Sequence, residues 1–191
     1  MSSSSPCCCS TAARRQAADS GRSGSTGADE RPRLGAGHRG YGRRRLAAAL
    51  GVTFIEGDRL HPPENVARMA SGEPLTDQLR EGWLNAIGER IAASVGQGNG
   101  VVAACSALKR SYRDRLSGFC PEIVFLYLEI DPGTARQRVG SRKGHFMPAS
   151  LVDSQFAILE PPAADERASK LNATHPVGEL VAAAVRLIRR S

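Results

Sequence analysis

The pattern of hydrophobic and polar positions changes abruptly at Leu46. Residues 1–30 are mostly Ser, Ala, Gly and Arg, with almost no large apolar side chain. Such a composition cannot bury enough apolar surface to offset the entropy of ordering, so we predict that this stretch is disordered. Residues 31–45 match neither the period of a strand nor that of a helix. We therefore expect a disordered or aberrant segment at 1–45 and one folded domain at 46–191.

Beyond this boundary, short apolar runs alternate with stretches of helical periodicity. The run 123–130 (IVFLYLEI) is apolar on both faces, as is typical of an interior strand in a parallel sheet. Residues 77–94 place large apolar side chains, Trp83 among them, at spacings of three and four, which predicts a helix. The other expected strands are 52–55 and 101–105, and the other expected helices are 62–70, 108–116, 132–142, 149–159 and 176–190. This alternation predicts an α/β fold of three layers, a parallel sheet with helices on both faces.

The net charge of +7 belongs mainly to the N-terminal segment. Nine of the 26 basic residues, but only three of the 19 acidic residues, lie in residues 1–50. The rest of the chain is close to neutral, and aromatic residues make up 5% of the sequence, so we expect no nucleic-acid partner. Because there is no run of 18 apolar residues and no continuous apolar stretch near the start, we expect neither a membrane span nor a secretory signal.

Cysteine usage favours a reducing, cytoplasmic location. The five cysteines are Cys7, Cys8, Cys9, Cys105 and Cys120. The three adjacent ones lack the paired spacing of a zinc site, and an odd count without a framework does not predict disulfides. We expect Cys105 to be a small buried apolar residue rather than a nucleophile.

One candidate for chemistry is Asp58, which follows the predicted strand 52–55. In a parallel sheet, ligands bind beyond the carboxyl ends of the strands. Gly57 allows the backbone to turn there, so the carboxylate of Asp58 could accept a proton or a hydrogen bond from a substrate hydroxyl. The alternative is a turn or helix-capping aspartate.

Cationic side chains follow the other predicted turns. Lys109 and Arg113 are four residues apart on a predicted helix, so they share a face that could hold an anionic substrate, or form an ordinary solvated surface. Arg80 follows the turn 72–75 and could bind a carboxylate through two hydrogen bonds, or form a surface ion pair.

A basic helix end followed by a glycine-hinged loop is what a lid over phosphates needs. Arg138 and Arg142 precede Gly144 and His145 in this arrangement. The alternatives are a solvent-facing helix end and a structural histidine. Further on, Glu160 and Pro161 mark the end of a helix.

Six blocks of sequence together resemble the gluconokinase family, which belongs to the shikimate-kinase-like and adenylate-kinase-like P-loop kinases. The blocks are GDRLHPPEN (57–65), RMASGEPL (68–75), CSALK (105–109), YRD (112–114), GHFMP (144–148) and SQFAILEPP (154–162). They occur in the family's order and spacing, and the resemblance covers about residues 46–190.

The resemblance implies transfer of a phosphoryl group from ATP, with Mg²⁺, to the 6-hydroxyl of D-gluconate, giving 6-phosphogluconate. It also implies a cytosolic homodimer and a role for Asp58 in binding the attacking hydroxyl, with Asp58 as the base. By the same resemblance, His61, Arg80, Lys109 and Arg113 line the gluconate side, Arg138, Arg142 and His145 belong to the lid, and Glu160 and Pro161 lie near the adenine.

The sequence departs from the family at the phosphate-binding loop. The family's GVSGSGKS loop falls in register on residues 33–40, so that its nucleotide-binding positions include Gly37, Arg39 and Gly40. Arg39 replaces the lysine that reaches the phosphates, and a planar guanidinium is no substitute for a compact ammonium. Gly40 replaces the serine that ligates magnesium. Residues 26–32 also lack the buried apolar strand that precedes the loop, so both the first strand and the P-loop are degenerate.

Two origins account for this departure: a segment before Leu46 translated in the wrong reading frame, or a pseudokinase whose start has diverged. Either way we expect severely reduced activity. A non-catalytic gluconate-binding protein and another small-molecule kinase, such as a shikimate kinase, are the alternative functions. Smaller departures are Glu56 in place of the usual Asp, and Lys170 and Asn172, which interrupt the last strand expected from the resemblance.

Overall fold

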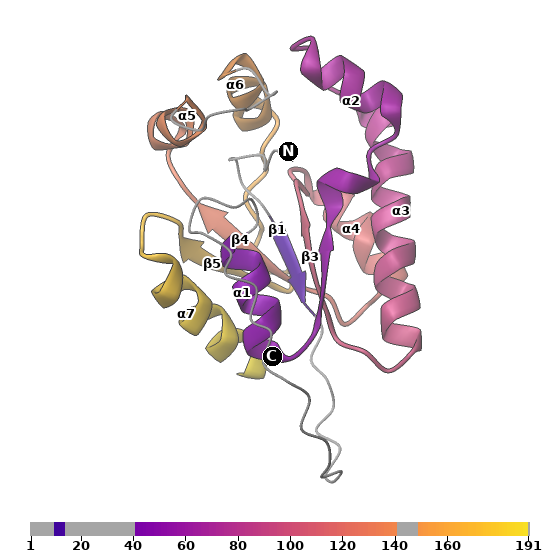
Figure 1. The fold of residues 1–191 in the computed structure, drawn as a ribbon, viewed down its shortest axis with the longest axis vertical. Coiled ribbons are helices and arrows are strands. Elements are labelled where there is room, and N and C mark those ends of the chain that lie inside the picture. The colour runs from indigo at the N-terminus through magenta and orange to yellow at the C-terminus, as the bar shows by residue number, and fades with distance from the viewer. Residues whose placement is uncertain (1–9, 14–40, 141–148, 191) are drawn as a thin grey trace, which may run out of the picture.

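The computed structural model describes residues 10–13, 41–140 and 149–190 (Figure 1). Its strands are β1 (Ser10–Ala13), β2 (Thr53–Glu56), β3 (Val101–Cys105), β4 (Val124–Glu129) and β5 (Ala168–Asn172). Its helices are α1 (Tyr41–Leu50), the short 3₁₀ helix η1 (Gly57–Leu60), α2 (Pro63–Ala70), α3 (Asp77–Gly96), α4 (Arg110–Phe119), α5 (Pro132–Gly140), α6 (Ala149–Ala157) and α7 (Val177–Arg190). Every strand and helix predicted beyond residue 46 is present, with ends that shift by a few residues. Among the described residues, no helix is both long and apolar enough to cross a membrane.

The five strands form one sheet in the order β2-β3-β1-β4-β5. The pairs β2–β3 and β4–β5 are parallel, with Glu56 opposite Ala104 and Phe125 opposite Ala168. These four strands confirm the predicted parallel arrangement. Because they run in the same direction, their carboxyl ends lie at one edge of the sheet, where a ligand site is expected.

Within residues 1–30, only residues 10–13 are among those that the structure describes. There, strand β1 corrects the prediction of disorder. It lies between β3 and β4 and runs antiparallel to both, with Ser10 opposite Cys105 and Ala13 opposite Val102. Four residues suffice because main-chain N–H and C=O groups on both sides can pair without any large side chain. The direction matters, since a P-loop follows the carboxyl end of its strand directly. Here the carboxyl end of β1, at Ala13, lies at the opposite edge from the carboxyl ends of its neighbours.

Helices cover both faces of the sheet (Figure 1), and an apolar cluster lies on each face. Alternate residues of β3 point in opposite directions, as the pleat of a strand requires. Val101, Ala103 and Cys105 pack in the cluster that contains α3 and α4. Val102 packs on the other face with residues of α1 and α7. This three-layer arrangement is the one that the sequence predicts, and Cys105 is buried as expected.

The boundary predicted at residue 46 is wrong, because α1 begins at Tyr41. Arginine is a good helix former, and the arginines at the start of α1 also find partners. The guanidinium of Arg44 lies 4.6 Å from the ring centroid of Phe54 and pairs with Glu56 at 3.7 Å. Leu46 and Ala47 are buried in the layer shared with α7. Tertiary contacts therefore extend the helix into a stretch with no helical pattern of its own.

Strand β5 forms although two polar residues interrupt its pattern. It is an outer strand, paired through β4 only. Leu171 is buried, and Lys170 Nζ pairs with Glu129 Oε1 of β4 at 3.0 Å. A lysine is a common residue on an outer strand, because it discourages pairing with other chains.

Candidate functional site

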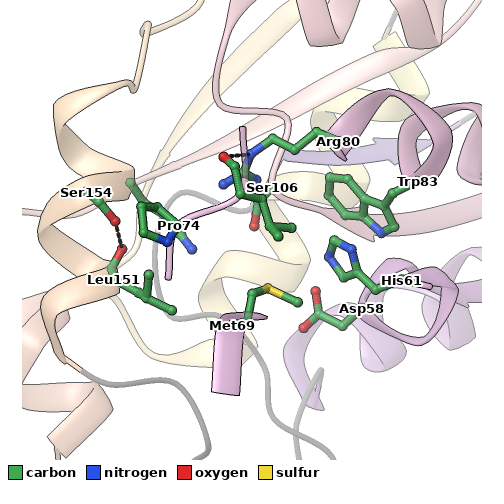
Figure 2. Close-up of a pocket in the computed structure, with 11 residues that line it drawn as sticks. Asp58, His61, Met69, Pro74, Arg80, Trp83, Ser106, Leu151 and Ser154 are labelled. Atoms are coloured by element: carbon green, nitrogen blue, oxygen red, sulfur yellow. Dashed lines mark hydrogen bonds between the residues drawn. The ribbon is translucent and has the colours of Figure 1, made fainter. Parts of the chain in front are cut away.

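A pocket lies at the carboxyl ends of β2 and β3, where the segments that follow these two strands meet α2, α3 and α6 (Figure 2). It is a small hollow that opens to solvent. Its polar lining consists of Asp58, His61, Arg80, Ser106, Ser154 and Gln155, and its apolar lining includes Met69, Leu75 and Leu151. Three of the predicted site residues, Asp58, His61 and Arg80, are thus brought together.

Gly57 determines where Asp58 is placed. Glycine is buried there against β3, and a Cβ added at this position would collide with the carbonyl oxygen of Ala104. The indole Nε1–H of Trp83 donates a hydrogen bond of 2.8 Å to the carbonyl oxygen of Gly57. The turn is therefore held from two sides, and Asp58 follows it into the wall of the pocket.

His61 presents a neutral imidazole at the pocket. Its ring stacks on Trp83 with centroids 4.3 Å apart and planes inclined by 10°. Burial, and then the positive charge of Arg80, lower the pKa of His61 to about 4. Nδ1 is buried and has no hydrogen-bond partner among the described residues. A neutral imidazole offers one donor and one acceptor, so this ring can bind a hydroxyl without adding charge.

Arg80 is a buried cation next to this imidazole. It lies in the first turn of α3, whose N-cap is Thr76, and only 6% of the residue is exposed. Its Nε donates to the carbonyl oxygen of Leu75 at 3.3 Å. Burial lowers the pKa of the guanidinium, but the group remains charged. A pre-positioned guanidinium, which carries five N–H donors in a planar fork, is suited to a carboxylate.

Lys109 lies outside the pocket in this structure. It is the N-cap residue of α4, so it does not share a helical face with Arg113 as predicted. Its Nζ contacts Asp77 Oδ2 at 2.6 Å, and Tyr112 Oη donates to Asp77 Oδ1 at 2.7 Å. These contacts join the first turns of α3 and α4 and lower the pKa of Asp77. A role for Lys109 in substrate binding stays a prediction.

Arg113 contradicts the prediction of a substrate-facing cation. It is 2% exposed and forms an ion pair with Glu166, with Nη2 and Oε1 2.9 Å apart. Its Nη1 also donates to the carbonyl oxygens of Ala107, Leu108 and Glu160. Because the guanidinium is used by the protein itself, Arg113 is a structural residue that fixes segment 160–166.

The described residues predicted for the lid and for the adenine site do not line the pocket. Arg138 Nη1 donates to the carbonyl oxygen of Ala173 at 2.8 Å. Glu160 Oε2 accepts the backbone N–H of Arg110 at 2.7 Å, and so caps α4 from a distance. Pro161 follows Glu160 in the segment that Arg113 holds. The predicted roles of Arg138, Glu160 and Pro161 in binding the nucleotide remain predictions.

Five predicted site residues lie outside the described residues: Gly37, Arg39, Gly40, Arg142 and His145. Among the residues that are described, no group of three or more His, Cys, Asp or Glu side chains could hold a metal ion. In register, Gly40 also lacks the ligand oxygen that Mg²⁺ requires. The residue at the serine position therefore does not fit a magnesium ligand, and α1 begins directly after these loop positions, at Tyr41.

Sequence reasoning missed several lining residues. Trp83 was predicted only as an apolar position on a helix, and Ser154 and Gln155 only as part of a motif block. Ser106 directly follows β3 at the ligand-binding edge, so the rule that found Asp58 could also have found it. No local signal shows that Trp83 reaches the turn at Gly57.

The arrangement places a buried guanidinium, a neutral imidazole and a carboxylate around one hollow (Figure 2). A cation binds one carboxylate, whereas the imidazole, hydroxyl and amide groups bind neutral hydroxyls. A molecule with one carboxylate and several hydroxyls matches this lining. Asp58 is then the group that can hold a reacting hydroxyl.

Comparisons with known proteins agree with this chemistry. No family model matches the chain. The chain is 49% identical to a gluconokinase of Gluconobacter oxydans over 121 residues, which cover 63% of this chain and 68% of the relative. It is 36% identical to the thermoresistant gluconokinase of Escherichia coli over 146 residues, which cover 76% of this chain and 83% of the relative. The crystal structure of a gluconokinase from Sinorhizobium meliloti superposes with a TM-score of 0.71 at 42% identity, covering 78% of this chain and 84% of the other.

Proposed function

Because this chain belongs to the gluconokinase family, we propose that its pocket binds D-gluconate as the acceptor of a phosphoryl group from ATP, which gives 6-phosphogluconate. The observation that carries the proposal is the convergence of Asp58, His61 and Arg80 at the carboxyl ends of β2 and β3. ATP supplies the transferred γ-phosphoryl group in this family's reaction, with Mg²⁺ as the usual counter-ion of its phosphates.

Each of the three residues has a distinct part in holding the sugar acid. Arg80 binds the carboxylate, because it is the buried cation of the pocket. The neutral ring of His61, which lines the pocket, binds a hydroxyl without adding charge. Asp58 holds the 6-hydroxyl and accepts its proton as the bond from its oxygen to the γ-phosphorus forms, while the bond between that phosphorus and the bridging oxygen breaks and ADP leaves. The carboxylate and the reacting hydroxyl are at opposite ends of the substrate, which matches binding groups of different charge in the pocket.

A non-catalytic sugar-acid-binding protein is the second candidate. Two observations favour it: Arg39 and Gly40 stand at the register of the P-loop lysine and serine, and β1 runs away from the pocket edge. Both observations bear on the binding of the phosphates of ATP, whereas the pocket bears on the binding of the sugar acid that accepts the phosphoryl group. The two candidates therefore share a ligand, D-gluconate, and differ in turnover.

Product formation separates the candidates. The 191-residue chain is incubated with ATP, Mg²⁺ and D-gluconate, and 6-phosphogluconate is measured through its dehydrogenase; shikimate replaces D-gluconate in a parallel reaction. Slow, D-gluconate-dependent product formation that Asp58→Asn abolishes supports the kinase. Binding of D-gluconate without any product supports the non-catalytic protein. Product from shikimate but not from D-gluconate would overturn both.

A cytoplasmic location and a homodimer, both implied by the family resemblance, belong to the same proposal. Light scattering of the purified chain tests the dimer directly. A mass of one chain, 20.3 kDa, would contradict it.

A further inference from the structure

Trp83 is the largest fully buried side chain that lines the pocket. Only 1% of the residue is exposed, and it is the single tryptophan of the chain. It lies on α3, one turn from Arg80, and its indole faces both η1 and His61 (Figure 2). One side chain therefore contacts two segments that carry pocket residues.

The first contact acts on the turn that carries Asp58. Trp83 Nε1–H donates to the carbonyl oxygen of Gly57, the residue immediately before Asp58, at 2.8 Å. The other side of Gly57 is filled, because a Cβ there would meet Ala104, Cys105 and Ile87. The turn is thus held between β3 and the indole, and loss of the hydrogen bond removes one of its two supports.

The second contact acts on His61. The nearly parallel stack on the indole fixes the plane of the imidazole, and with it the direction in which Nδ1 points. Nδ1 makes no hydrogen bond within the described part of the chain, so no protein group there orients the ring through this atom. The indole is consequently the group that determines how the ring faces the hollow.

We propose that Trp83 is a positioning residue of this site: a single indole sets both the Asp58 turn and the His61 ring, so that both meet a bound polyhydroxy carboxylate in a fixed relative arrangement. This inference rests on the proposed function for the identity of the ligand. Nothing in the arrangement requires Trp83 itself to touch the ligand. The competing explanation is a core residue whose only effect is on stability.

Two variants separate the two contacts. Trp83→Phe keeps an aromatic ring for His61 and loses the N–H, whereas Trp83→Leu loses both. The matched control is Ile91→Ala, which removes a side chain of equal burial from the same helix, two turns further on and away from the pocket. Thermal unfolding identifies which variants are folded, and Trp83→Phe carries the test if Trp83→Leu does not fold.

The first readout needs no ligand. The titration of His61 is followed by NMR in each protein. We expect His61 in Trp83→Phe to titrate near the wild-type value, and in Trp83→Leu to move toward 6.5, the ordinary value for histidine. An unchanged titration in Trp83→Leu would mean that the indole does not set the environment of the ring, and would overturn the inference.

The second readout is the affinity for D-gluconate, measured by calorimetry. We expect Trp83→Phe to bind about tenfold more weakly than wild type and Trp83→Leu about a hundredfold more weakly, with Ile91→Ala within about twofold. Wild-type affinity in both Trp83 variants would overturn the inference and leave the proposed function standing. If the wild-type chain binds no D-gluconate, the proposed function fails, and the His61 titration alone decides the role of Trp83.

Discussion

The part of the proposed site that binds the sugar acid, here called the acceptor side, differs from the part expected to bind the phosphates of ATP, here called the phosphate side. The two differ in how many of the residues expected from the family are present. The acceptor side is built from the segments after β2 and β3, together with α3, and it brings Asp58, His61 and Arg80 around one hollow. The phosphate side depends on the first strand and the loop after it. There the sequence has Arg39 and Gly40 in the register of lysine and serine, and β1 runs antiparallel to its neighbours.

The contrast shows that the two halves of such a site are structurally separable. The turn that carries Asp58 and the stack that holds His61 are fixed by contacts within residues 53–106, such as the hydrogen bond from Trp83 to Gly57 and the parallel pairing of β2 with β3. None of these contacts requires a particular side chain in β1. The position between β3 and β4 can be filled by any segment whose main chain pairs with both strands. Here it is filled by the four small residues of β1, which run antiparallel to their neighbours.

The largest expected effect concerns turnover. Compared with the Gluconobacter oxydans relative assayed in parallel, we expect this chain to form 6-phosphogluconate at least about a thousandfold more slowly. Removing one preorganised group that stabilises the transition state slows an enzyme about 100- to 1,000-fold, and two such groups are replaced here. Rates within tenfold of the relative's would show that the phosphate side works, and the contrast between the two halves would disappear.

A smaller effect is expected at the buried ion pair that holds segment 160–166. Arg113→Met leaves the carboxylate of Glu166 buried without its partner, so we expect a loss of about 3–5 kcal/mol in the free energy of unfolding. Because Arg113 lies outside the pocket, D-gluconate affinity should stay within about threefold. Chemical denaturation and calorimetry measure the two quantities.

The matched control for this variant is Arg115→Met. Arg115 pairs with Glu81 at 2.7 Å, and this pair is far more exposed than that of Arg113 with Glu166. An exposed pair contributes only about 0–1 kcal/mol, so the control should remain close to wild type. A loss of D-gluconate binding in Arg113→Met, at unchanged stability, would show that Arg113 contributes to substrate binding, as the sequence predicts.

Within the pocket, Arg80→Gln tests the site of carboxylate binding. Loss of a charge-assisted hydrogen bond weakens binding by about 1.5–3 kcal/mol, so we expect D-gluconate affinity to fall about 10- to 100-fold. D-glucitol, which has a hydroxymethyl group in place of the carboxylate, should bind both proteins equally weakly. Arg68→Gln, which breaks an exposed pair with Glu73, is the control. Equal affinity of Arg80→Gln and wild type for D-gluconate would place the carboxylate elsewhere.

The smallest effect concerns acid stability. The pKa of His61 is about 4 in the folded protein and 6.5 when unperturbed, so between these values the unfolded chain binds more protons than the folded one. Stability is therefore almost unaffected by His61 well above pH 6.5 and falls as the pH drops from 6.5 to 4, by about 2.6 kcal/mol over that range. Asp58 and Arg80 line the same pocket as this ring, and Arg80 contributes to the shift.

Urea denaturation between pH 4.5 and 7, followed by the fluorescence of Trp83, measures this slope. His61→Phe should flatten it, while His175→Asn should not, because His175 is exposed and pairs with Glu179 on the surface. The same slope in His61→Phe and wild type would show that His61 is not the titrating group.

The sequence predicted the folded domain well because its signals there are local. The strand VVAAC has the predicted bounds, and the apolar face of α3 is buried at Trp83, as its periodicity indicates. Asp58 was found because parallel strands place their carboxyl ends at one edge. Arg80 was found from the turn 72–75 that precedes it and from the geometry by which arginine binds a carboxylate.

The errors have long-range causes. Arg113 was assigned to the substrate because its partner, Glu166, is 53 positions away and no spacing rule connects them. Strand β1 was missed because its strand character comes from the unpaired edges of β3 and β4, not from its own small side chains. The stack of His61 on Trp83 likewise depends on how η1 lies against α3.

Calorimetric titration of the 191-residue chain, first with D-gluconate alone and then with ATP and Mg²⁺, tests the separation of the two halves most directly. We expect saturable binding of D-gluconate at one site per chain, and no saturable binding of ATP at concentrations that saturate the Gluconobacter oxydans relative. Saturable ATP binding together with no detectable heat from D-gluconate would reverse the assignment of the intact half and contradict the account.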